Sequence, residues 1–226
     1  MYQPETEPGD LAEVIGRLER HERLPSEPWL NLVPPPSPHR AAVVACPAYV
    51  IVAAAVDRRW LDSWLSGADF AAASGPPFMN ALEECLRLEA GALDVVLLAS
   101  RRPATPPIDL TALDASDHPR VARAHRYRTD VRIWANPHGV LTIGRGLAGR
   151  WEANVEVHED SRNQGHGRAL AAAARHLVPE DRPLWAQVAP GNAASLRAFL
   201  AAGYVPVGSE ILLTPPGLDT LSSAAS

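Results

Sequence analysis

The sequence predicts a protein of the α/β class, with a mixed sheet and two parts along the chain. In the second half, the pattern of one helix and three strands is followed by helix, strand, helix and two strands. An apolar strand pattern at residues 93–99 gives way to an Arg- and Pro-rich stretch, residues 101–107, that has no periodicity. Because 226 residues suffice for two cores, we expect an N-terminal α/β region at residues 1–106 and a second domain at residues 107–226.

Composition and charge argue against several classes of protein. A formal net charge of -5 lacks the positive excess of a general nucleic-acid binder. The N-terminus lacks the basic and apolar regions of a signal peptide, and the longest apolar run, residues 41–56, is interrupted by Pro47. Cys46 and Cys85 have no metal or redox spacing, so buried thiols are favoured over a disulfide. We therefore expect a cytoplasmic protein without a nucleic-acid or membrane partner.

In the first half, Asp10 is the expected N-cap of an amphipathic helix, and Asp57 that of a helix with Trp60 and Trp64 on one face. The face that carries the two tryptophans favours packing in a core or at an interface over lining a ligand pocket. If it is an interface, the protein can form a homodimer. A Pro-rich stretch, residues 25–38, favours a stiff linker over a polyproline recognition element. The expected elements are helix 10–22, two strands within 41–56, helix 57–67, helix 76–88 and strand 93–99.

In the second half, the turn residues 136–139 (NPHG) predict a hairpin. A helix that starts at Ser116 or Asp117 has a basic face, for which a solvated surface is favoured over contact with an acidic partner or a cofactor phosphate. That face consists of Arg120, Arg123, Arg126 and Arg128. The expected elements are helix 117–128, strands 131–135, 140–147 and 151–157, helix 165–177, strand 184–188, helix 192–203, and a hairpin of strands 204–207 and 210–213.

Residues 155–170 (VEVHEDSRNQGHGRAL) change from a strand pattern to an Ala-rich helix pattern at Gly165 and Gly167. The unpaired amides and the positive dipole end of a helix bind anions, and glycines let an anion approach the backbone. Arg162 and Arg168 flank the turn and can add charge-assisted contacts. The stretch predicts a phosphate or pyrophosphate site, with a plain strand-to-helix turn as the alternative. It lacks the Lys-Ser/Thr pair of a P-loop and the third glycine of a dinucleotide fingerprint.

Two motifs carry a family resemblance. Residues 162–167 (RNQGHG) follow the aliphatic Val157 by five positions, and residues 192–195 (NAAS) lead into a helix pattern that ends at Gly203-Tyr204. In order and spacing they resemble the two signatures of the GNAT superfamily of acetyl-CoA-dependent N-acetyltransferases. The resemblance covers about residues 107–213 and implies an acetyl-CoA-binding acyltransferase fold there. Residues 1–106 carry neither motif, so they are interpreted as a degenerate second copy or an extension.

The resemblance implies acetyl-CoA as co-substrate and no metal. Backbone amides of residues 163–168 would hold the pyrophosphate, and Val155 and Val157 would pair with the pantetheine and the acetyl carbonyl. Asn192 and Ser195 would contact the cofactor from the next parallel segment. The expected cofactor-binding residues are Val155, Val157, Arg162, Asn163, Gln164, Gly165, His166, Gly167, Arg168, Asn192 and Ser195.

The catalytic candidates follow from the chemistry of an amine attacking a thioester. The amine must first lose a proton, so a nearby carboxylate is useful. Family members with a strand carboxylate as base carry it ten residues before the motif, where this chain has Glu152, and Glu156 is the second candidate. Either glutamate can instead pair with an arginine such as Arg145 or Arg150. Many members also carry a thiolate-protonating tyrosine where this chain has Phe199.

The expected function is transfer of an acetyl group from acetyl-CoA to a primary amine, on a small molecule or a peptide. The alternative is an acyl-CoA-binding or interaction module with weak or no catalysis, which the phenylalanine favours, and a nucleotide-binding protein is a third interpretation. Asp130, Glu152, Glu156 and Glu210 suit a cationic acceptor if the fold brings them together. The motifs encode neither the acceptor nor the acyl-chain preference.

Overall fold

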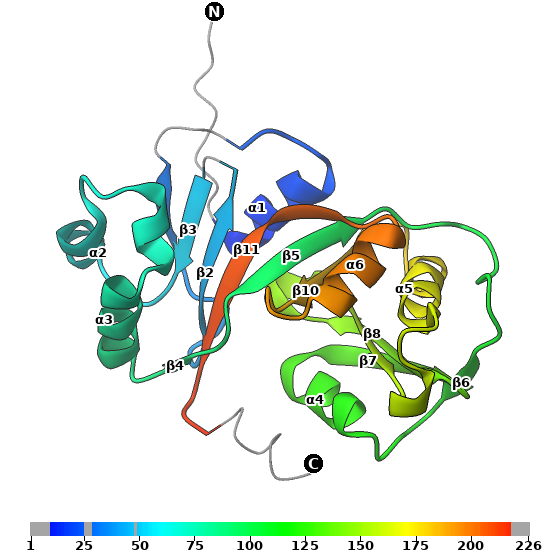
Figure 1. The fold of residues 1–226 in the computed structure, drawn as a ribbon. Helices are drawn as coiled ribbons and strands as arrows, with labels where there is room; N and C mark the ends of the chain where they lie inside the picture. The colour runs from blue at the N-terminus through cyan, green and yellow to red at the C-terminus, as the bar shows by residue number, and fades with distance from the viewer. Residues whose placement is uncertain (1–9, 25–28, 48, 218–226) are drawn as a thin grey trace, which may run out of the picture. The chain divides into compact units, whose positions relative to one another are not determined.

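The computed structural model describes residues 10–24, 29–47 and 49–217. The chain forms two compact units, and Figure 1 shows their elements. The first unit holds the described residues up to Asp94 and those from Val207 on, and the second holds Val95–Pro206. Within the described ranges, no helix is long and apolar enough to cross a bilayer.

Strands from both ends of the chain build the first unit. β1 (Leu30–Val33) runs parallel to β3 (Tyr49–Ala53), and β2 (Ala41–Cys46) runs antiparallel to β3. β11 (Val205–Thr214), which belongs to this unit from Val207 on, pairs antiparallel with β2 and with the short β4 (Glu89–Ala90). Every residue of β3 is buried, as expected for a strand covered on both faces.

Aspartates begin two helices of the first unit, as predicted. The Asp10 carboxylate accepts a hydrogen bond from the Glu13 amide (2.8 Å) before α1 (Leu11–Glu19). The Asp57 carboxylate accepts one from the Trp60 amide (2.7 Å) before α2 (Arg58–Leu65). A 3-10 helix, η1 (Phe70–Ser74), leads into α3 (Pro76–Leu86), and buried residues of α2 and α3 share one core with the strands.

The Trp face and the cysteines of the first unit only partly match the expectation. The Trp60 ring packs against the core, 6.0 Å from the Phe78 ring, whereas Trp64 is 45% exposed. Cys46 is buried as expected, but Cys85 on α3 is exposed, and both thiols are free. The expectation of two buried thiols is therefore wrong for Cys85.

The second unit is a mixed sheet with helices on both faces. Its strand order is β5 (Asp94–Ala99), β10 (Leu184–Val188), β9 (Trp151–Val157), β8 (Gly139–Arg145), β7 (Thr129–Asn136) and β6 (Thr111–Leu113). β9 and β10 are parallel, and the other neighbours are antiparallel. The helices are α4 (Pro119–Tyr127), α5 (His166–Leu177) and α6 (Ala193–Ala201), with the 3-10 turns η2 (Leu147–Gly149) and η3 (Glu159–Ser161). The predicted mixed α/β fold is confirmed.

The helices of the second unit divide between the two faces of its sheet. Leu141 of β8 packs in one core with α5 and α6, whereas its neighbour Val140 packs with Val121 of α4. Because successive strand residues point to opposite faces, α4 covers the face opposite to α5 and α6. Glu156 on β9 is the cross-strand partner of Val140, so the even-numbered side chains of β9 point toward α4.

The compact units differ from the expected boundary at residues 106/107. β5 pairs with β10 and therefore belongs, from Val95 on, to the second unit. β11 pairs with β2 and therefore belongs, from Val207 on, to the first. Both assignments depend on pairing between strands that are far apart in sequence. The loss of periodicity at residues 101–107, from which the boundary was predicted, carries no information about such pairing.

Local predictions failed in two places. The expected terminal hairpin is wrong, because residues 205–214 form the single strand β11. A Cβ at Gly208 would overlap the Ala45 carbonyl of β2, so this glycine permits close strand approach and does not form a turn. The stretch 25–38, expected to be a linker, contains β1, and its residues 25–28 lie outside the described residues.

Candidate active site

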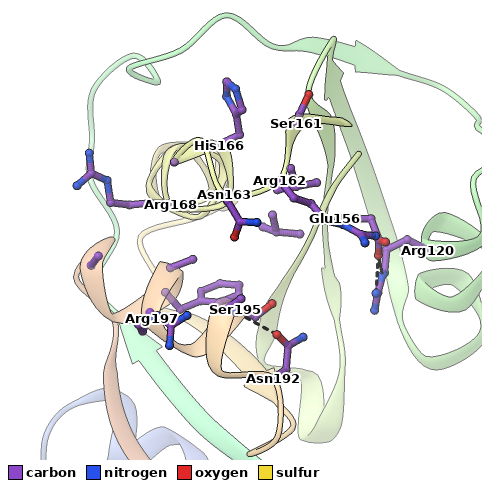
Figure 2. A pocket seen from close by; sticks show the side chains of 18 residues that line it. Arg120, Glu156, Ser161, Arg162, Asn163, His166, Arg168, Asn192, Ser195 and Arg197 are labelled. Atoms are coloured by element: carbon purple, nitrogen blue, oxygen red, sulfur yellow. Dashed lines mark hydrogen bonds and ion pairs between the residues drawn. The ribbon is translucent and has the colours of Figure 1, made fainter. Parts of the chain in front are cut away.

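A cavity of about 740 Å³ opens where the end of β9 meets α5 and α6 (Figure 2). Its walls come from β9, the loop that follows, the start of α5, several turns of α6, and Arg120 of α4. All of these residues belong to the second unit. The volume falls in the range of small-molecule pockets, about 300–1,000 Å³.

The loop before α5 has the backbone of an anion-binding turn. Asn163 and Gly165 both have left-handed backbone, with φ of 61° and 86°. The Gln164 side chain donates to the Asp160 carbonyl oxygen at 3.0 Å and ties the loop to η3. Of the residues expected here, Arg162, Asn163 and Gly165 line the cavity, whereas Gln164 does not.

The first turn of α5 opens toward the cavity. Its N-cap is Gly165, which offers no side-chain acceptor, so the first amides of the helix remain available to a ligand. A Cβ at Gly167 would lie 3.5 Å from both the Ala198 Cβ and the Val157 Cγ2, so the helix starts close to α6 and β9. The amides and the helix dipole together favour a phosphate at this end. The expected residues that line the cavity here are His166, Gly167 and Arg168.

β9 and β10 separate beside the cavity. β9 pairs with β8 along its whole length, but its register with β10 joins only Glu152 to Trp185. Among the described residues, β9 therefore has no partner on β10 beyond Glu152, and the expected residues Val155 and Val157 line the cavity there. An unpaired strand edge presents amides and carbonyls with which an extended, amide-containing chain can pair.

The start of α6 forms the opposite wall. The Asn192 side-chain oxygen accepts a hydrogen bond from the Ser195 amide at 3.0 Å, which confirms Asn192 as the N-cap, and both residues line the cavity. Phe199 also lines the cavity and meets the Tyr204 ring edge-on, with centroids 4.9 Å apart. Tyr204 is a core residue, because its hydroxyl donates to the Ala171 carbonyl oxygen at 3.3 Å and burial raises the pKa of the phenol.

Glu152, the first candidate base, is buried under α4 and does not line the cavity. Its carboxylate accepts hydrogen bonds from Nε of Arg128 (2.7 Å), Nε of Arg150 (2.8 Å) and the Leu147 amide (3.2 Å). Burial alone raises the pKa of this carboxyl, but the two guanidinium groups outweigh it and lower the pKa to about 2. A Cβ at Gly146 would overlap the carboxylate, which leaves no room for an acceptor there. The placement of Glu152 thus differs from its expected catalytic role and matches the alternative of pairing with Arg150.

Glu156 is the candidate base that does lie in the cavity. Its carboxylate accepts a hydrogen bond from Nε of Arg120 at 2.6 Å, and the side chains are 27% and 36% exposed (Figure 2). Arg120 comes from the first turn of α4. His118, the N-cap of this helix, accepts a hydrogen bond from the Arg120 amide through Nδ1 at 3.1 Å. The basic face of α4, expected to be solvated, therefore contributes an arginine to the cavity.

The cavity is predominantly basic. Among the described lining residues, Glu156 is the only acid, against four arginines. Those arginines are Arg120, Arg162, Arg168 and Arg197. This charge complements the open end of α5 and suits a ligand that carries several negative charges.

Histidines stack in two pairs around the loop. The rings of His138 and His166 stack with centroids 3.7 Å apart, and His138 Nδ1 lies 3.1 Å from the Ser161 hydroxyl. His158 stacks more loosely on His118, at 6.2 Å. In the part of the chain that the structure describes, no group of three His, Cys, Asp or Glu residues is arranged to hold a metal ion.

Sequence reasoning missed several lining residues. Arg197 lies two positions after Ser195, so extending the second signature through the next turn of the helix would have found it. Ser161 directly precedes the first signature, so extending that signature by one residue toward the N-terminus would have found it. No local signal separates Arg120 from the other arginines of α4, because its place depends on how the helix packs against β9.

No protein-family model matches the chain, and no curated relative does. Several solved structures resemble it: a GCN5-related N-acetyltransferase from Kribbella flavida (19% identity, TM-score 0.41), one from Sphaerobacter thermophilus (15%, 0.38) and a GNAT-family acetyltransferase from Colwellia psychrerythraea (9%, 0.38). The matches cover 62%, 61% and 62% of this chain, and 65%, 55% and 62% of those chains. These three structures are acetyltransferases, but at such identities and TM-scores the likeness shows nothing about the activity of this chain.

Proposed function

We propose that the chain is an acetyl-CoA-dependent N-acetyltransferase that transfers the acetyl group to a primary amine. The observation that supports this proposal most directly is that one cavity joins the open N-terminus of α5 to the unpaired edge of β9. The helix end suits a pyrophosphate, and the strand edge suits an extended chain that contains amides. Coenzyme A carries both groups in this order.

The residues of the cavity fit such a ligand. The left-handed backbone at Asn163 and Gly165 turns successive amides toward one point, and Gly167 keeps the helix start close to β9. Arg162 and Arg168 add charge at the phosphate end. The other residues proposed to contact the cofactor are Val155, Val157, His166, Asn192 and Ser195.

The reaction assigned to this cavity is nucleophilic acyl transfer, for which the bound thioester supplies the activated carbonyl carbon. Glu156 accepts a proton from the ammonium of the acceptor, directly or through a water. The amine nitrogen then forms a bond to the carbonyl carbon and loses a second proton to water, the C–S bond breaks, and the sulfur leaves as a thiolate. An amide on the unpaired edge of β9 stabilises the negative charge on the carbonyl oxygen. Phe199 has no proton to give, so the thiolate takes one from water.

The proposal is tested by thiol release from acetyl-CoA in the presence of a panel of primary amines. Glu156→Gln should lower kcat by about 100-fold or more, while the affinity for acetyl-CoA stays unchanged. Glu159→Gln, at an exposed position of η3 outside the cavity wall, is the matched control and should keep the wild-type rate. Equal rates for Glu156→Gln and Glu159→Gln would remove Glu156 from the mechanism.

A second candidate is an acyl-CoA-binding module without turnover. It is favoured by Phe199, because no tyrosine hydroxyl lines the cavity among the described residues. Such a module would bind acetyl-CoA but release no thiol with any amine. In an enzyme limited by thiolate protonation, Phe199→Tyr should raise kcat without changing the affinity for acetyl-CoA.

A further inference from the structure

The acceptor end of the cavity carries a matched pair of opposite charges. Glu156 and Arg120 meet at 2.6 Å, and both side chains are partly exposed on the cavity wall. They lie on the α4 side of the sheet, because Glu156 is among the β9 side chains that point toward that helix. The phosphate end lies at α5, on the other face. An acceptor that approaches from the α4 side therefore meets the Glu156–Arg120 pair.

The acidic residues that suggested a cationic acceptor do not gather at this place. Asp130 pairs with Arg145 at 3.3 Å, and Glu152 is buried between two arginines. Glu210 is buried in the first unit, so it gives no support for a shared acidic site. Of the four, only Glu156 lines the cavity, and Arg120 compensates its charge.

We propose that the acceptor is a zwitterion, an amine that carries a carboxylate on the same small molecule, such as an amino acid. Its ammonium binds Glu156 and its carboxylate binds Arg120. This inference rests on the proposed acetyltransferase function and names the substrate class for the same cavity.

Binding of an amine at Glu156 changes the ion pair that this residue forms with Arg120. A simple amine that takes Glu156 competes with Arg120 and leaves the partly exposed guanidinium without its counter-ion. A zwitterion supplies one charge of each sign, so both protein groups keep a charge-assisted hydrogen bond. The carboxylate also fixes the amine relative to Glu156, which positions the nitrogen for proton transfer.

The test compares ω-amino carboxylates of increasing chain length with their primary amides. The two series differ only in the anionic group, and thiol release gives kcat/KM for each. A second readout is calorimetric titration of each amine into the CoA-saturated protein, which cannot turn over. Arg120→Gln removes the proposed contact, and Arg120→Lys keeps a positive charge. Arg123→Gln is the matched control, because Arg123 lies on the same helix, stacks over Tyr127 at 4.9 Å, and does not line the cavity.

We expect the best ω-amino carboxylate to exceed its primary amide by about tenfold or more in kcat/KM and in affinity. This is the difference expected from one additional charge-assisted hydrogen bond. Arg120→Gln should abolish this preference, because the carboxylates lose their contact and the amides no longer compete with Arg120 for Glu156. Arg120→Lys should retain part of the preference, and Arg123→Gln should leave it intact. An unchanged affinity of the Arg120 variants for CoA shows that they are folded.

The outcomes separate the inference from the function on which it rests. If amides equal carboxylates, or if the preference survives Arg120→Gln, the zwitterion inference is overturned while the acetyltransferase function stands. If no amine releases thiol, the acetyltransferase proposal fails. In that case the titration of amines into the CoA-saturated protein tests the inference. The inference stands only if the carboxylates bind more tightly than their amides and Arg120→Gln abolishes this difference.

Discussion

At the residue scale, the two glutamates of β9 have opposite surroundings although they share one face of the strand. Both pair with an arginine of the α4 region, Glu152 with Arg128 and Glu156 with Arg120. The Glu152 side chain is only 5% exposed and is held by a second arginine, Arg150, whereas that of Glu156 is 27% exposed and lies in the cavity. Burial therefore makes the first a structural ion and leaves the second accessible from the cavity.

Replacement of Glu152 should mainly reduce stability. Glu152→Gln removes the buried carboxylate charge with which Arg128 and Arg150 pair. A carboxyl pKa lowered from 4.5 to about 2 corresponds to about 3 kcal/mol of stability at neutral pH. We expect the variant to lose about that amount in denaturant unfolding at pH 7. A loss below about 0.5 kcal/mol would contradict a structural role for this carboxylate.

The same residue predicts a pH dependence. Because the pKa of Glu152 is lower in the folded chain than in the unfolded one, its contribution is complete above about pH 4.5. It is lost as the pH falls from there toward about 2. The stability difference between wild type and Glu152→Gln should therefore shrink over this range, which unfolding curves at successive pH values measure. A difference that stays constant with pH would mean that the carboxyl is not held as an anion.

At the element scale, two helices begin at the cavity in different ways. α5 starts with Gly165, which caps nothing, whereas α6 starts with Asn192, whose side chain satisfies the Ser195 amide. The amides of the first turn of α5 are therefore available to a ligand. The cap on α6 stabilises the wall on which Ser195 and Phe199 lie.

The cap on α6 can be tested separately. Asn192→Ala should lower stability by about 1 kcal/mol, because the Ser195 amide loses its acceptor. Asn192→Asp retains an acceptor oxygen and should restore most of the loss in thermal unfolding. Equal melting temperatures for the alanine and aspartate variants would show that the side chain does not cap the helix.

Helices and motifs could be predicted from the sequence because their signals are local. Caps at Asp10, Asp57 and Asn192, and the strand-to-helix change at Gly165, each depend on a few adjacent residues. β11 was missed because its Pro206 and Gly208 mimic a turn, and β1 was missed because it lies in a Pro-rich stretch and pairs with a strand that comes later in the chain. The burial of Glu152 and the place of Arg120 in the cavity depend on how α4 packs, which no local pattern encodes.

At the scale of the whole molecule, the units do not divide the chain at residues 106/107. Nearly all of β5 belongs to the second unit, and most of β11 belongs to the first. The second unit needs β5, which pairs with β10 and contributes Leu97 and Ala99 to the core. The first unit needs the end of β11, which contributes Ile211 and Leu213. The cavity lies wholly within the second unit, so the first unit is not required to form its walls.

This division predicts how fragments behave. A fragment of residues 107–226 lacks β5 and carries β11 without its partner β2, so it should show no cooperative unfolding. A fragment of residues 95–206 contains all strands and helices of the second unit and should unfold cooperatively. Circular dichroism during thermal unfolding measures both. Cooperative unfolding of the 107–226 fragment alone would favour the boundary expected from the sequence.

The proposed function requires that the open end of α5 holds the pyrophosphate of acetyl-CoA. The most direct measurement is calorimetric titration of the wild type, Gly165→Glu and Gly67→Glu with acetyl-CoA. Both glycines have left-handed backbone, with φ of 86° and 73°, and open space where a Cβ would lie, so the two variants bear the same backbone strain and charge. Gly67 belongs to the first unit and is not part of the cavity wall. We predict micromolar binding by the wild type and by Gly67→Glu, and none by Gly165→Glu. Failure of the wild type to bind, or equal binding by both variants, would contradict the claim.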